Sequence, residues 1–137
     1  MSKETNIAAQ TKFGEAVNSA NYEIFKEIVA ANSVDHDPAP GQVPGPDGYA
    51  DFFGMMRTAF PDMKLTVEQL SADEDTVSFA YRVTGTHEGD FMGNPASGKA
   101  INIRGMQISK FEDGKMVERW GSSDELGILK QIGVIAN

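Results

Sequence analysis

The stretch "AINIRGMQISKFEDGKMVERW", residues 100–120, decides the fold. Apolar residues alternate with polar ones along its first half, as in a strand with one buried face. The pattern is interrupted by Glu112-Asp113-Gly114, and an Asp-Gly pair is a strong turn signal. The stretch therefore predicts a β-hairpin.

Two further strands are predicted before this hairpin, in "MKLTVEQL" (63–70) and "DEDTVSFAYRVTGTH" (73–87). The second places four apolar residues on one face, namely Val77, Phe79, Tyr81 and Val83. The connection "EGDFMGNPASGK" (88–99) is rich in glycine and proline, so we expect a lip or lid there.

Helices are predicted on either side of these strands. Residues 6–30 form a helical pattern that breaks at "NSAN" (18–21), and Val29 still belongs to the apolar face of its second part. Residues 34–48 hold four of the six prolines and predict an ordered loop. Pro46 is placed to begin a helix with a wide apolar stripe, and a last helix is expected over residues 124–132.

An element order of helices first, antiparallel strands next and one closing helix is typical of an α+β fold. We expect a single domain over residues 1–137, with the N-terminal helices packed in a curved antiparallel or mixed sheet and a short C-terminal helix. The interior of such a half-cone is apolar and open at one end. It is a natural pocket for a small molecule.

Composition narrows the function classes. The chain has 137 residues, 40% of them hydrophobic, which suffices for a real core. A net charge of −8 argues against nucleic-acid or anionic-membrane binding, and the lack of cysteine excludes disulfides and thiolate chemistry. Neither a signal-peptide pattern nor an apolar run of about 18 residues is present, so we expect a cytoplasmic protein.

Catalytic motifs that need a metal or cofactor are missing. His36 and His87 are the only histidines and lie far apart, and no acidic cluster has metal-ligand spacing, so we expect no metal. The sequence has no G-x-S-x-G elbow, phosphate loop or G-x-G-x-x-G fingerprint, and we expect no cofactor. What remains is proton transfer by carboxylate and imidazole.

Asp124 is the leading candidate for such chemistry, and two interpretations are open. Ser122 and Glu125 match a capping box, and an acidic residue in a first helical turn is favoured by the helix dipole. Alternatively, Asp124 projects from the strand-to-helix junction into the pocket mouth and acts as a base. The two roles do not exclude each other.

Other polar candidates also have two interpretations. His36 either bonds to local backbone or contacts the substrate, and His87 is expected to be exposed near the lip. Gln107 either faces outward or faces the pocket and donates to a developing oxyanion. Arg104 has the same two alternatives: it lies on the outer face of the sheet, or its positive charge stabilises the oxyanion. Trp120 is expected to pack in the core, with a contact at the pocket edge also open. The expected apolar substrate contacts are Phe53, Met56 and Phe91.

Three segments together resemble a known family. They are "VDHDPAPGQVPGPDGYADFFGMMRTAFPDMKLTVEQL", "TGTHEGDFMGNPASGK" and "FEDGKMVERWGSSDELGILKQIG". They resemble the SnoaL-like polyketide cyclases, also called ester cyclases, over about residues 8–135. The resemblance implies an NTF2-like cone, a homodimer formed through the convex sheet face, and a cofactor-free intramolecular aldol condensation. It makes Asp124 the acid/base and places His36 and Gln107 in the pocket.

Two positions depart from the family pattern. Many members have Asp where Gln107 stands and His where Arg119 stands, so the polar lining of the pocket differs. A rival enzyme function starts from "DHDP", which resembles the segment carrying the base in ketosteroid isomerases and would make Asp37 a proton shuttle. The Arg-x-Asp pair of limonene-epoxide hydrolases is not matched, because Met106 follows at the Asp position after Arg104. A non-catalytic ligand-binding domain is the alternative outside enzymes.

Overall fold

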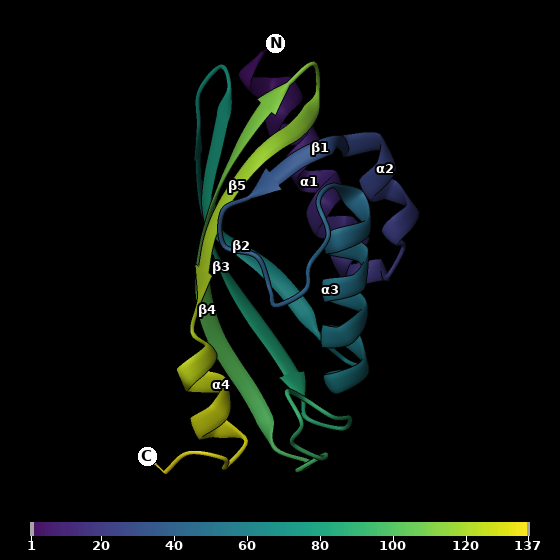
Figure 1. Ribbon diagram of the computed structural model, residues 1–137. Coiled ribbons are helices and arrows are strands. Elements are labelled where there is room, and N and C mark those ends of the chain that lie inside the picture. The colour runs from purple at the N-terminus through teal and green to yellow at the C-terminus, as the bar shows by residue number, and fades with distance from the viewer. Residues whose placement is uncertain (1, 137) are drawn as a thin grey trace.

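The computed structural model describes residues 2–136 and confirms the predicted α+β fold. A curved five-stranded sheet carries the larger helices on one side, and the last helix packs at one end (Figure 1). Among the described residues, no helix is long and apolar enough to cross a membrane. The elements in chain order are α1 (Lys3–Ser19), η1 (Tyr22–Ile24), α2 (Phe25–Ile28), β1 (Val29–Asp35), α3 (Pro46–Ala59), β2 (Lys64–Ala72), β3 (Thr76–Thr86), β4 (Ala100–Glu112), β5 (Lys115–Ser123) and α4 (Glu125–Gln131).

The sheet has the order β1-β5-β4-β3-β2. Strands β2 to β5 form an antiparallel meander, and β1 adds to β5 in parallel. The predicted hairpin is confirmed as β4–β5, and its turn has positive φ at Asp113 (52°) and Gly114 (77°). Two consecutive positive φ values match the twist of antiparallel strands, which explains why the Asp-Gly signal was reliable.

Strand β1 corrects the sequence prediction. The helix stops at Ile28, two residues before its predicted end, and residues 29–35 form a strand instead of a helix end and a loop. Val34 pairs with Glu118 and Asp35 with Arg119 on β5. Val29 fitted the helical pattern, yet it begins strand β1, and its side chain is buried. Pairing with a strand more than 80 residues later outweighs local periodicity here.

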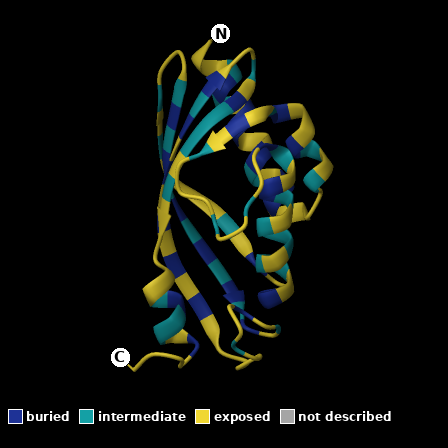
Figure 2. Ribbon diagram, in the orientation of Figure 1, coloured by how far each residue is buried: buried dark blue, intermediate teal, exposed yellow. Residues whose placement is uncertain are grey.

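The core lies between the helices and the inner face of the sheet. Side chains alternate between buried and half-buried along β3 and mostly between buried and exposed along β4, and the helices turn their buried faces toward the strands (Figure 2). An aromatic cluster joins α1, α2 and α3, with the Phe13 ring centroid 4.7 Å from that of Phe25 and 5.5 Å from that of Tyr49. Tilted and edge-on contacts of this kind stabilise beyond the area they bury.

His87 is buried, contrary to the expectation that it is exposed. Its side chain continues the inward alternation of β3, and its ring centroid lies 5.6 Å from that of Phe60. Nδ1 accepts the Ser97 backbone N–H at 3.1 Å and lies 2.8 Å from the Ser97 hydroxyl oxygen. The imidazole therefore fastens the connection between β3 and β4 rather than standing free at a lip.

Replacing Phe25 should strongly destabilise the fold. Phe25→Ala removes the fully buried ring that α1 and α3 share, and we expect the free energy of unfolding to fall by about 3–5 kcal/mol. Urea unfolding followed by circular dichroism measures this. Met55→Ala, on the exposed side of α3, is the control and should change stability by less than about 0.5 kcal/mol. Equal effects of the two substitutions would contradict this account of the core.

Candidate active site

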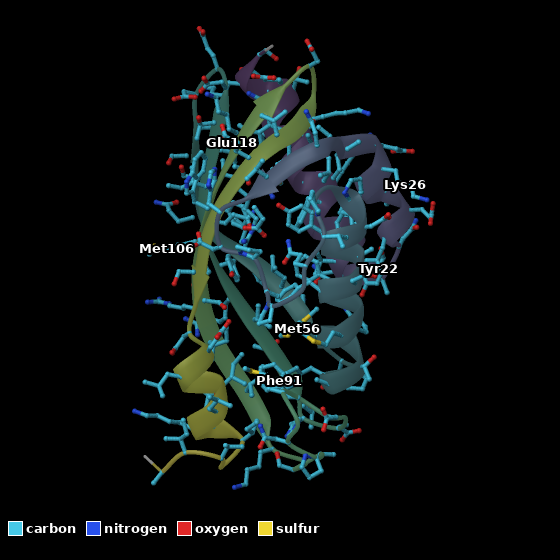
Figure 3. All side chains as sticks on the ribbon, viewed as in Figure 1. Tyr22, Lys26, Met56, Phe91, Met106 and Glu118 are labelled. Atoms are coloured by element: carbon cyan, nitrogen blue, oxygen red, sulfur yellow. The ribbon has the colours of Figure 1, made fainter. Side chains whose placement is uncertain are left out.

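A cavity of about 80 Å³ lies between α1 and α3 on one side and the inner face of the sheet on the other. Its walls are mostly apolar, and its few polar side chains come from β3, β4 and β5 and, on the opposite wall, from Gln10 of α1. Phe53 and Met56, two of the expected apolar substrate contacts, line it, and Met56 points from α3 toward the sheet (Figure 3). The lining residues are Gln10, Phe13, Gly14, Phe52, Phe53, Met56, Met63, Leu65, Val67, Phe79, Tyr81, Val83, Ile103, Gln107, Arg119, Ser123 and Ile128.

Gln107 faces inward and is 5% exposed, so the interpretation that it faces outward is wrong. Its Oε1 accepts from Arg119 Nε at 2.9 Å, and its Nε2 donates to the Ser109 hydroxyl at 2.9 Å. Both ends of the amide are therefore used within the protein. In this arrangement Gln107 orients the Arg119 guanidinium.

Arg119 is held by a second partner, Asp35. Nη1 donates to both carboxylate oxygens, at 3.0 and 3.2 Å, and the two side chains are only 16% and 8% exposed. Asp35 also accepts from Gln42 Nε2 and from the Asp37 backbone N–H, each at 3.0 Å. The pair joins β1 to β5 and fixes the proline-rich loop that follows β1. Among the described residues, no side chain accepts a hydrogen bond from Arg119 Nη2.

Two glycines make room for the polar groups. A Cβ on Gly121 would overlap the Arg119 guanidinium, and one on Gly105 would overlap the phenol end of Tyr81. Tyr81 and Gly105 are cross-strand partners, so the ring covers the glycine. Burial raises the pKa of the Tyr81 hydroxyl, although the Arg119 charge acts in the opposite direction. Tyr81 is therefore a neutral phenol that can donate a hydrogen bond.

Asp124 lies outside the cavity lining. It is exposed, and its Oδ1 accepts the Gly127 N–H at 2.8 Å at the start of α4. The capping residue is therefore Asp124 itself, and the predicted capping box built on Ser122 is wrong. Its own N–H donates to the Arg104 carbonyl at 3.0 Å, and Ser123, one residue earlier, lines the cavity. Asp124 thus sits at the rim.

Three other predicted residues lie on the outer side of the sheet. His36 is exposed, bonds through Nε2 to Glu118 at 3.1 Å, and stacks on Trp120 with ring centroids 4.6 Å apart. Trp120 is 38% exposed, so the expectation that it packs in the core is wrong. Arg104 is exposed and pairs with Glu68 at 3.5 Å, the outer-face alternative. The reason is register: Gln107 faces inward opposite Gly121, which leaves Trp120 facing outward.

Phe91 is buried but does not line the cavity. Its ring centroid lies 5.4 Å from that of Phe60, so it anchors the β3–β4 connection (Figure 3). Met106 lies on the opposite side of the sheet from the helices (Figure 3).

The sequence did not mark Gln10, Asp35 or the Tyr81 hydroxyl as groups of this region, and Arg119 was noted only as a departure from the family pattern, with no role assigned to it. A signal existed for Arg119, because it occupies an inward position between the outward Glu118 and Trp120 once Gln107 is placed inward. Nothing local marked Asp35, whose partner is 84 residues away.

Breaking the Asp35–Arg119 pair on one side only should be costly. Arg119→Met leaves a nearly buried carboxylate without its counter-charge, and we expect a loss of about 3 kcal/mol in the free energy of unfolding. The double variant Asp35→Asn/Arg119→Met should recover most of that loss, because no unpaired charge remains. Denaturant unfolding of the full cycle measures the coupling. Arg104→Met, at an exposed ion pair, is the control and should lower the free energy of unfolding by at most about 0.5 kcal/mol. If the effects of the Asp35 and Arg119 substitutions on the free energy of unfolding are additive, the buried-pair account is contradicted.

Comparison with known proteins agrees with this architecture. The SnoaL-like polyketide cyclase family model matches residues 7–132. Aklanonic acid methyl ester cyclase DnrD of Streptomyces peucetius is 24% identical over 136 residues, which is 94% of this chain and 91% of that protein. The structure of TsrD from Streptomyces laurentii superimposes with a TM-score of 0.89 at 21% identity, covering 98% and 99% of the two chains.

IdmH from Streptomyces antibioticus, a candidate polyketide cyclase, superimposes with a TM-score of 0.81 at 30% identity, covering 93% of this chain and 98% of that one. The fold is therefore the NTF2-like α+β cone that the resemblance implied. Since the family model spans nearly the whole chain, this protein belongs to the SnoaL-like polyketide cyclase family.

Proposed function

We propose that this protein is a cytoplasmic enzyme that closes a ring by cofactor-free acid/base chemistry, an intramolecular aldol condensation, on a small apolar carbonyl compound such as a polyketide ester. One observation carries the proposal. An apolar cavity ends in two hydrogen-bond donors, the Arg119 guanidinium, which Gln107 and Asp35 hold in place, and the Tyr81 hydroxyl, and such donors would stabilise a developing oxyanion. Family membership supports a cyclase role.

The reaction needs a base, a cavity that holds the substrate folded, and a hydrogen-bond donor to the oxygen that becomes negatively charged. A carboxylate removes a proton from carbon between two carbonyls, and the resulting enolate carbon attacks a second carbonyl of the same molecule. The new alkoxide then takes a proton back, so no atom or electron is lost. Preorganised donors stabilise the enolate oxygen. Apolar walls hold the chain folded, which removes much of the entropic cost of ring closure.

Asp124 remains our proposed base. Its carboxylate follows directly on a lining residue, and it would have to exchange its bond to Gly127 N–H for the substrate when the pocket mouth is filled. His36 is bonded to Glu118 on the outer side, so we assign it no direct step. Asp37 accepts the Gly121 N–H at 2.9 Å and borders a shallow depression on the outer face, which weighs against a ketosteroid-isomerase-like shuttle.

The volume of the cavity limits the size of the substrate that it can hold. About 80 Å³ is well below the roughly 300–1,000 Å³ of pockets for drug-sized ligands. A polycyclic substrate therefore requires side chains on α3 to move. Met56 is suited to this, because methionine is unbranched and adapts its shape.

A specific observation favours a second candidate, a non-catalytic binding domain. No carboxylate lines the cavity in the part of the chain that the structure describes, and Asp124 is engaged as a helix cap. Under this alternative an apolar ligand is bound and recovered unchanged.

Substitutions at Asp124 separate capping from catalysis. Asparagine caps helices as well as aspartate does but is no base, so Asp124→Asn should keep its stability and lose turnover by about 10²-fold or more. Asp124→Ala should lose turnover and also about 1 kcal/mol of stability. Aklanonic acid methyl ester, named for the relative DnrD, is the first substrate to assay.

Asp37→Asn is the matched control, and it should leave cyclisation unchanged. Full activity of Asp124→Asn would rule out Asp124 as base. Activity on a Δ5-ketosteroid that Asp37→Asn abolishes would favour the isomerase alternative.

We also propose that the protein is a homodimer formed through the outer face of the sheet, where Met106, Ile108 and Trp120 are exposed together. Met106→Glu should then shift the molecular mass measured by light scattering toward that of one chain. Met92→Glu, at another well-exposed methionine on the β3–β4 connection, should have no effect. A wild-type protein that elutes as a monomer would refute the dimer.

A further inference from the structure

Gln10 carries a buried amide oxygen to which no described residue donates a hydrogen bond. It lies on α1, is 4% exposed and lines the cavity opposite the sheet. Its Oε1 is fully buried and has no hydrogen-bond partner among the described residues. An unsatisfied buried amide is costly, so a retained one calls for an explanation. A ligand in the cavity supplies one.

Arg119 offers the other free group. Its Nε and Nη1 are used by Gln107 and Asp35, which leaves Nη2, lying over Gly121, to donate to something else. Because the guanidinium is fixed at two of its three nitrogens, the third is preorganised, and binding to it costs little side-chain entropy.

The charge of the site selects among oxygen ligands. Asp35 neutralises Arg119 at 3.0 Å, so the pair has no net charge. The whole chain carries −8. A carboxylate would enter this cavity without a compensating positive charge, whereas a neutral carbonyl needs only the hydrogen bond.

The rest of the lining is mostly apolar and includes several aromatic rings, Phe13, Phe53 and Phe79 among them. Such walls favour a flat apolar body that stacks against rings. The ligand thus has an apolar middle and hydrogen-bonding groups at its two ends.

We propose that Arg119 Nη2 and the Gln10 amide are the two polar anchors of the cavity, and that its ligand is a neutral, ring-sized hydroxy-carbonyl compound with the carbonyl oxygen at Arg119 and the hydroxyl at Gln10. A hydroxyl both donates and accepts, so it satisfies whichever end of the amide faces the cavity. The enol form of a 1,3-dicarbonyl compound has this pair of groups, as does the β-hydroxy ketone that an aldol closure produces. The inference rests on the proposed function and specifies its substrate class.

Binding of small probes tests the anchors without any turnover. The probes are the three positional isomers of hydroxyacetophenone, with acetophenone, phenol and 4-hydroxybenzoate for comparison, measured by calorimetry or NMR titration. We expect at least one isomer to bind about five-fold more tightly than acetophenone and than phenol, the equivalent of one net hydrogen bond of about 1 kcal/mol. The anion 4-hydroxybenzoate should bind more weakly than 4-hydroxyacetophenone.

Variants of the two anchors test which group of the probe each anchor binds. Gln10→Met keeps the side-chain length and should remove the advantage over acetophenone, and Asp35→Asn/Arg119→Met should remove the advantage over phenol. Gln69→Met, the same change at an exposed position on β2, is the matched control and should change neither.

Three results would overturn the inference: no probe binds at millimolar concentration, the anion binds best, or Gln10→Met behaves like its control. Failure of the proposed cyclisation looks different. In that case the Asp124 variants and the wild type are equally without turnover, while the probes still bind with the pattern described above.

Discussion

The Asp35–Arg119 ion pair is the interaction on which the site depends. It joins the edge strand β1 to β5 where the two strands are paired in parallel, and it is largely removed from solvent. Burial of two charges is tolerated only because the remaining oxygens and nitrogens are bonded, here to Gln42, the Asp37 N–H and Gln107. One pair thereby fixes the proline-rich loop, the position of the edge strand and the direction of the guanidinium at the cavity.

A sheet with two different faces follows from the same register. Gln107, opposite Gly121, and Arg119 face the helices, whereas Met106, Ile108 and Trp120 face away from them. The inner face therefore carries both the core and the cavity's polar end. The outer face keeps an exposed apolar patch. Glycines at 105 and 121 let the tyrosine and arginine side chains lie across neighbouring backbone, which no larger residue would permit.

In the proposed function one carboxylate, that of Asp124, serves folding and chemistry at different moments. At rest it caps α4, a role that the exposed start of a helix requires. A short strand-to-helix junction also places it directly after a cavity residue. A catalytic role of Asp124 would require its carboxylate to give up the helix-capping hydrogen bond, which is of modest strength. A substrate that excludes water from the rim of the cavity would offer a hydrogen bond in its place. The cap is therefore compatible with the proposed base.

By itself the sequence determined the α+β class, the β4–β5 hairpin, helix α3 from Pro46, and the apolar inward face of β3, because turn chemistry, proline placement and alternation are properties of neighbouring residues. Resemblance over most of the chain also identified the family correctly. Tertiary structure alone decided that residues 29–35 are a strand, that Trp120 faces outward and Arg119 inward, and that Asp35 finds a partner 84 residues away. These outcomes depend on strand register and long-range pairing, whose free energy comes from segments that local periodicity cannot bring together.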